Sequence, residues 1–145
     1  MTQQNDMDEA LKRLEDDYVR AVKENDSTNV KDFIEQFLYD SWEYNDQNIE
    51  MIKTVLGRYS SGRIPQRTFR SSFNYMTEEL QEKLRQLDHD KVYPVLHSKD
   101  GASMLVAFVD GLVLQYYIGA YDVDDLREMT PYLKRVILQM LKTEV

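Results

Sequence analysis

The stretch SMLVAFVDGLVLQYYIGAY, residues 103–121, decides how this chain folds. It is the most apolar run in the sequence and contains one acid, Asp110, and no basic residue. A membrane-spanning helix needs about 20 predominantly apolar residues, usually with Lys or Arg in its flanks. This run also contains Gln115, and its nearest charged neighbours are the acids Asp100 and Asp122. We therefore expect a buried helix of a folded domain and no membrane span.

The composition of the whole chain favours one helical domain. A chain of 145 residues has the size of a single domain and buries roughly two-thirds of its unfolded surface. It has only five glycines and three prolines, which leaves few turns for a sheet protein. The expected fold class is therefore all-α, with about six helices in one domain that covers residues 1–145.

Charge and cysteine content exclude several classes of function. The chain has no cysteine, so it has no disulfide, thiolate metal site or cysteine nucleophile. The formal net charge is -8, whereas nucleic-acid binders normally carry a basic face, so we expect no direct DNA binding. The N-terminal sequence MTQQNDMDEALKR lacks the apolar core of a signal peptide, and the expected location is the cytoplasm.

Apolar residues that recur every three or four positions predict the helices before the central run. A first helix is expected over residues 6–24, where Asp6 and Glu9 have the spacing of a capping box. A second helix should start near Thr28, and a third should open at Asp46.

Prolines and loop residues mark the remaining boundaries. The fourth helix is expected to follow the loop SSG, with Pro65 in its first turn, where a missing N–H costs nothing. Residues 88–101 are expected to be a connector. In the last segment, residues 122–145, Pro131 either kinks a final helix or restarts it with Thr130 as the cap.

The central helix is apolar on nearly every side, which favours partners on both sides. One stripe contains Leu105 and Val109, and a second contains Met104, Phe108 and Gly111. Glycine in a helix interior costs roughly 1 kcal/mol relative to alanine and makes sense where another helix backbone comes close. Two such chains would form an intermolecular four-helix bundle.

The dimerisation helices are accordingly expected at about residues 99–121 and 123–143. The expected interface residues are Leu105, Val109, Leu112, Tyr116, Leu133, Val136, Ile137 and Met140. The alternative is a monomer in which the central helix is simply buried.

The segment KDGASMLVAFVDGLVLQYYIGAYDVDDLREMTPYLKRVILQML resembles the last two helices of TetR/AcrR-family transcriptional regulators. The shared features are small and apolar residues that lead into Asp110, Gly111 and Leu112, a short acidic link and a final amphipathic helix. The resemblance covers about residues 99–143 and is only architectural before them.

The resemblance implies an all-helical regulatory domain that dimerises through its last two helices. In that family an inducer pocket usually lies between the middle helices and the penultimate one, and a separate N-terminal helix-turn-helix unit reads DNA. No such unit is evident in this sequence, so the chain is either a natural short relative or an excised piece of a longer regulator. We expect it to modulate transcription by dimerising with, or binding, a full-length transcriptional regulator, as an antirepressor or anti-activator. The alternative is a small-molecule-sensing dimerisation domain from a longer repressor.

Aromatic residues are the candidates for an apolar or aromatic ligand pocket. The chain has ten tyrosines and five phenylalanines, a surplus for a small helical core. Aromatic side chains with a few polar tips are typical of apolar ligand pockets. If the family topology holds, a pocket would be lined by Phe33, Phe37, Trp42, Tyr59, Phe69, Phe73, Met76 and Phe108. The alternative is that these residues fill the core.

Other chemistry has little support in the sequence. Asp88, His89, Asp90 and His97 include metal-ligating types, but their spacing matches no metal motif, and we expect exposed loop residues. There is no glycine loop for phosphate and no convincing Ser, His and Asp arrangement. The sequence therefore predicts no enzyme, no cofactor and no bound metal.

Overall fold

A computed structural model describes residues 7–145, and over these residues the protein is all-helical with no strand. The elements are α1 Glu9–Glu24, α2 Val30–Gln47, α3 Ile49–Ser60, α4 Gln66–Leu87, the 3-10 helix η2 Pro94–His97, α5 Gly101–Tyr117 and α6 Val123–Leu141. The predicted all-α class with six main helices is confirmed. No helix in this part of the chain combines the length and the apolar character needed to cross a bilayer.

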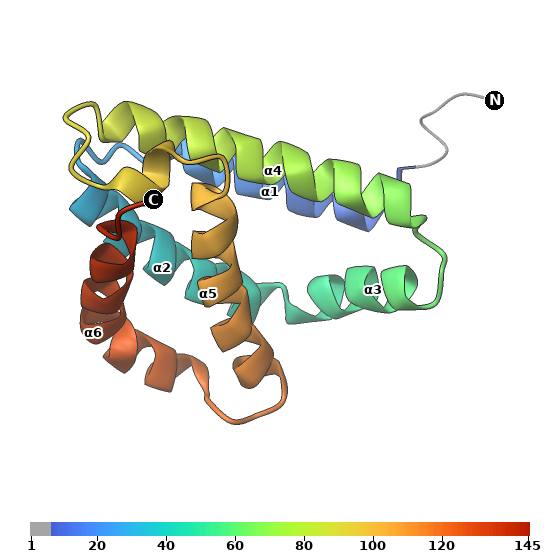
Figure 1. The fold of residues 1–145 in the computed structure, drawn as a ribbon. Coiled ribbons are helices and arrows are strands. Elements are labelled where there is room, and N and C mark those ends of the chain that lie inside the picture. The colour runs from blue at the N-terminus through green and yellow to red at the C-terminus, as the bar shows by residue number, and fades with distance from the viewer. Residues whose placement is uncertain (1–6) are drawn as a thin grey trace.

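The helices pack in pairs that are distant in sequence. Figure 1 shows α1 and α4 side by side along one edge, with α5 running away from them toward the α5–α6 turn. Helix α6 packs most extensively on α2, and α1 packs on α4. Helix α3 extends to the opposite side from α6 (Figure 1).

Two clusters of buried side chains hold these pairs together. The main core joins α2, α4, α5 and α6, and its fully buried side chains include Phe33, Trp42 and Leu105. A smaller cluster of Leu11, Val55 and Ile64 fixes α1 and α3 to the loop before α4. Because α3 has its own small cluster, it contributes little to the main core.

Several helix ends differ from the sequence predictions. Helix α1 begins at Glu9, because the side chain of Asp8 accepts hydrogen bonds from the first-turn amides; the expected cap, Asp6, lies outside the described residues. Helix α2 continues through Asp46 to Gln47, since no residue there breaks its hydrogen bonding, so the predicted start of the third helix at Asp46 was wrong. Pro65 stands at the N-cap of α4, one residue before its first turn.

Helix α6 runs without a break through Pro131, so of the two alternatives expected there, a restart of the helix was wrong. Thr130 lies inside the helix and is not a cap. Its hydroxyl donates to the carbonyl of Leu126 at 2.7 Å and accepts the indole N–H of Trp42 at 2.9 Å. This buried pair of hydrogen bonds ties α6 to α2.

A tight connector sets the start of α5. The side-chain amide of Gln81 donates to the carbonyl of Leu96, and its oxygen accepts the amide of Ala102 at 2.7 Å. A Cβ at Gly101 would overlap the carbonyl oxygen of Val95, so only glycine fits where α5 meets η2. Helix α5 therefore begins two residues before the apolar run of the sequence.

Candidate interaction surface

The outward side of α5 is apolar although it is exposed to solvent. The buried side of this helix includes Leu105, Val109 and Val113. The opposite side carries exposed small and apolar residues that follow one another at helical spacing, Met104, Ala107, Gly111, Leu114 and Ile118. We call these residues, together with Tyr132, Val136 and Met140 of α6, the α5–α6 face.

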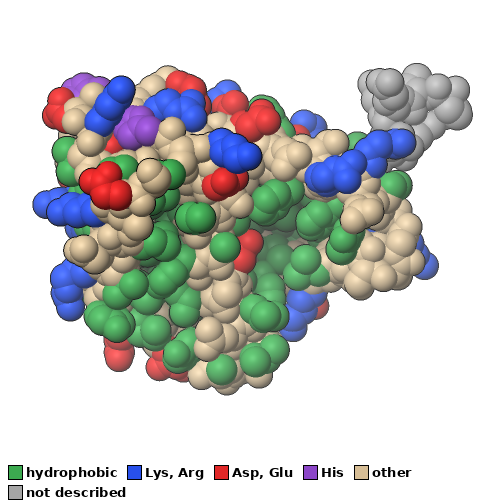
Figure 2. Space-filling model, in the orientation of Figure 1, with side chains coloured by type: hydrophobic (Ala, Val, Ile, Leu, Met, Phe, Trp, Pro, Cys, Tyr) green, Lys and Arg blue, Asp and Glu red, His purple; other side chains and the backbone are tan. Residues whose placement is uncertain are grey.

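Exposure on the α5–α6 face is high for large apolar side chains. The exposed fractions are 50% for Met104, 59% for Leu114, 72% for Ile118 and 58% for Tyr132. Figure 2 shows hydrophobic side chains gathered over α5 and α6 in this view. Single exposed apolar residues are normal on protein surfaces, but a contiguous set of them marks an interaction site.

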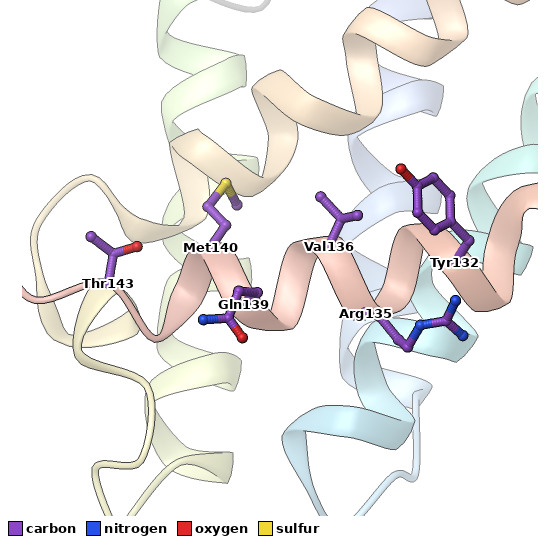
Figure 3. A pocket seen from close by; sticks show the side chains of 6 residues that line it. All are labelled: Tyr132, Arg135, Val136, Gln139, Met140 and Thr143. Atoms are coloured by element: carbon purple, nitrogen blue, oxygen red, sulfur yellow. The ribbon is translucent and has the colours of Figure 1, made fainter.

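Helix α6 contributes an open groove to this face. The groove has a volume of about 530 Å³ and is lined by Tyr132, Arg135, Val136, Gln139, Met140 and Thr143. Figure 3 shows Tyr132, Val136 and Met140 projecting from one side of the helix, with Arg135 and Gln139 on the adjacent side. Because all of these residues lie on α6 or just after it, the groove is shallow, with apolar side chains along one edge and polar ones along the other, as at the edge of a protein interface.

Gly111 has no role in the packing of its own chain. A Cβ built at this position meets no atom within 4 Å, whereas the same test at Gly101 finds an overlap. Glycine in the middle of a helix costs roughly 1 kcal/mol relative to alanine. The packing of a single chain therefore gives no reason for this residue, and the close approach of a second helix would.

Charged residues on the two sides of α6 differ in their partners. On the side facing α2, Lys134 pairs with Glu35 at 2.8 Å and Arg127 pairs with Glu43 at 2.7 Å. On the outward side, Arg135 stacks over Tyr132, at 6.0 Å from the ring centroid, and has no ion pair within residues 7–145. Glu128, two turns earlier on the same side of the helix, is also exposed and without an ion pair in this range.

The expected interface residues divide into two groups. Leu105, Val109, Leu133 and Ile137 are buried in the core of their own chain, so in this structure they cannot touch a second copy. The other four, Leu112, Tyr116, Val136 and Met140, are partly exposed. Helices α2 and α4 cover the stripe of α5 that contains Leu105. The outward residues of α5 therefore belong to the other stripe, which contains Met104 and Gly111.

The expected pocket residues do not enclose a common cavity in the structure. Phe33, Phe37 and Trp42 are buried in the main core, where the first two stack at 5.9 Å. Partly buried Phe73 and Phe108 pack against the same core. Phe69 belongs to the small α1–α3 cluster, Tyr59 packs on its ring at 4.6 Å, and Met76 is partly exposed on α4.

A separate polar group of atoms lies on the side of α5 that faces α1 and the end of α2. Asp110 is open to solvent, yet the surrounding protein limits its hydration, and this burial raises the pKa of its carboxyl to about 6. Burial and the nearby Asp110 charge raise the pKa of Tyr18 on α1 and of Tyr117 on α5. The hydroxyl of Tyr117 donates to Asn45 of α2 at 2.6 Å. The signal in the sequence was one acid within the most apolar run, which served as an argument against a membrane span and as part of the family resemblance, and not as a candidate site residue.

Asp88 and His97 of the connector have a structural role in this fold, whereas His89 and Asp90 do not. Buried Asp88, contrary to the expected exposed loop residue, accepts the amides of Val92 at 3.0 Å and Tyr93 at 2.9 Å and contacts His97 Nε2 at 2.9 Å. His89 and Asp90 are exposed, as expected. No group of three or more potential metal ligands occurs within residues 7–145.

Comparisons with protein-family models, curated proteins and solved structures found no match for this chain.

Proposed function

We propose that this chain is a TetR-like regulatory module that pairs through the α5–α6 face with a second copy of itself or with the equivalent helices of a full-length transcriptional regulator. Such pairing would modulate transcription by changing which dimers carry DNA-reading units, as an antirepressor or anti-activator does. The net charge of -8 favours action through a protein partner over direct contact with DNA.

The observation that carries the proposal is an apolar face whose middle residue is Gly111. Its apolar side chains are exposed on two helices, and no neighbour in the chain explains the glycine. Homodimers typically bury such continuous apolar patches about a twofold axis. The resemblance of residues 99–143 to the last two helices of TetR/AcrR regulators supports the same pairing.

The test compares the mass of the protein in solution with that of surface variants. We expect wild type to sediment as a dimer at micromolar concentration, and Met104→Glu and Tyr132→Glu to sediment as folded monomers. Both side chains are at least half exposed in a single chain, so the charge costs stability only where a partner buries it.

Tyr75→Glu is the matched control, because Tyr75 is 42% exposed on α4, away from the α5–α6 face. This variant should remain a dimer. A monomeric wild type, or a Tyr132→Glu variant that stays dimeric, would contradict the pairing. A second experiment tests whether pairing acts on transcription. Host cells that lack the protein are complemented with wild type or with Tyr132→Glu, and their transcript levels are compared.

A second candidate function is a small-molecule sensor, which the Asp110 group favours. Sensors of this class bind ligands in apolar sites with few polar groups, and perturbed titration behaviour often marks such sites. The pKa of Asp110 is raised to about 6 by burial within an otherwise apolar helix.

A further inference from the structure

Asp110 lies among polar groups that have no hydrogen-bond or ion-pair partner within residues 7–145. Within residues 7–145, no hydrogen bond or ion pair joins its carboxylate to another residue. By contrast, the two buried carboxylates of residues 7–145 are matched: Glu15 pairs with Lys12 at 3.2 Å, and Asp88 accepts two backbone amides. Asp110 therefore stands out as an acid in apolar surroundings without a positive partner.

The hydroxyl of Tyr18 also lacks a hydrogen-bond partner. It is buried and has no hydrogen-bond partner in the structure, although nearly all buried hydroxyls have one. Its ring packs edge-on against Phe37 at 6.3 Å, which fixes its position on α1. The negative charge of Asp110 reaches this hydroxyl and raises the pKa of Tyr18, so an unpaired donor and an unpaired carboxylate lie in the same region.

The surroundings of this group are apolar and open on one side. Val106, Asp110, Val113 and Tyr117 follow one another at helical spacing on the same side of α5, and both valines are buried. Figure 2 shows the surface hollowed between α5 and α3, below α4, with hydrophobic side chains on its walls. An apolar body can therefore approach a carboxylate that has aromatic neighbours.

We propose that Asp110, with Tyr18 and Tyr117, binds an organic cation, an amine or quaternary ammonium carried on an apolar body. A positive charge compensates the carboxylate that the chain itself leaves unpaired, and the tyrosine rings attract cations through their faces. A metal ion fits less well, because no further carboxylate or histidine joins Asp110 to complete a ligand set in the described residues. This proposal rests on the sensor candidate and does not depend on dimerisation.

The test uses three probes that share one body and differ in charge: 4-phenylbutyltrimethylammonium, 4-phenylbutanol and 4-phenylbutyrate. Calorimetric titration at pH 7.5 should show the cation binding wild type most tightly and the anion most weakly. Asp110→Asn should weaken binding of the cation by about tenfold or more and leave the affinity for the neutral probe unchanged. Binding of the cation should also weaken below pH 6, as Asp110 takes up a proton.

Asp26→Asn is the control, because it removes the same charge from an exposed residue in the loop between α1 and α2. It should bind all three probes as wild type does. Equal binding of the cation and the alcohol would overturn cation recognition but leave a neutral-ligand sensor standing. Failure of all three probes to bind wild type would overturn both cation recognition and the sensor function. The sedimentation result for the dimer would still stand.

Discussion

The carboxyl group of Asp110 has a pKa near 6 because the helices around it limit its hydration. In the unfolded chain the same group titrates near its usual value of 3.8. Between these two pH values the folded protein binds more protons than the unfolded chain, so stability from this group is greatest at low pH and falls as pH rises to about 6. Above that pH both states are ionised and the contribution no longer changes.

Asp110→Asn should remove this dependence, since asparagine resembles the neutral acid. We expect the variant to be more stable than wild type at pH 7.5 and equal to it near pH 4, with the difference growing between these values. Urea unfolding midpoints measured at several pH values, without ligand, would test this. A difference that stays constant with pH would show that burial does not disfavour the ionised form, and Asp26→Asn should show no such trend.

At the level of single residues, the sequence could not predict which side chains from distant helices become neighbours. Asp110 was visible as a lone acid, but Tyr18, which its charge affects, comes from helix α1, and Asn45, which binds the nearby Tyr117, comes from helix α2, and no local pattern places either beside α5. The aromatic residues were predicted to converge, and the structure distributes them between two clusters because α3 packs on α1 rather than on the main core.

Between helices, the contact of α2 with α6 includes one buried polar pair among its apolar side chains. The indole N–H of Trp42 donates to Thr130 at 2.9 Å, and the Thr130 hydroxyl donates to Leu126 at 2.7 Å. A buried donor left without a partner costs about 1–3 kcal/mol, more than a net hydrogen bond contributes.

Thr130→Val should therefore lower the free energy of unfolding by about 1–3 kcal/mol, because it preserves shape and leaves the Trp42 N–H unpaired. Thr130→Ser keeps the hydroxyl and should cost clearly less. Chemical unfolding followed by the fluorescence of the single tryptophan measures both variants. A loss for serine with no loss for valine would mean that the methyl group, and not the hydrogen bond, stabilises this contact.

The helices themselves were predictable, and the orientation of α5 was not. Apolar spacing of three and four residues identified α2, α4 and α6, since each has one apolar stripe. Helix α5 is apolar on both its buried and its outward side, so spacing alone could not tell which stripe faces α2 and α4. We assigned Leu105 and Val109 to the interface for this reason, and they lie in the core.

At the level of the complete chain, the α5–α6 face also carries charges suited to a twofold partner. Glu128 and Arg135 are exposed on one side of α6, on either side of Tyr132 along the helix. If two α6 helices cross antiparallel near Tyr132, each Glu128 lies opposite the partner's Arg135.

Charge reversal tests this arrangement. Glu128→Arg and Arg135→Glu should each weaken the homodimer, because like charges then face each other across the axis. The two variants mixed together should form a heterodimer, and the double variant should recover the homodimer. Sedimentation of the four proteins and of the mixture measures this, and a double variant that stays as weak as the singles would exclude the antiparallel crossing.

The packing of α6 on α2 has a consequence for how the protein is made. Residues 30–47 leave the ribosome long before residues 123–141, and only the latter cover much of their apolar side. At about 5–20 residues per second, synthesis of the intervening chain takes roughly 5–20 seconds, during which Phe33, Ile34 and Phe37 lack their final neighbours. The growing chain therefore presents an aggregation-prone helix throughout the second half of its synthesis. Chaperone demand should be set by the time needed to reach residue 141, and synonymous codons that slow translation after residue 47 would prolong that exposure.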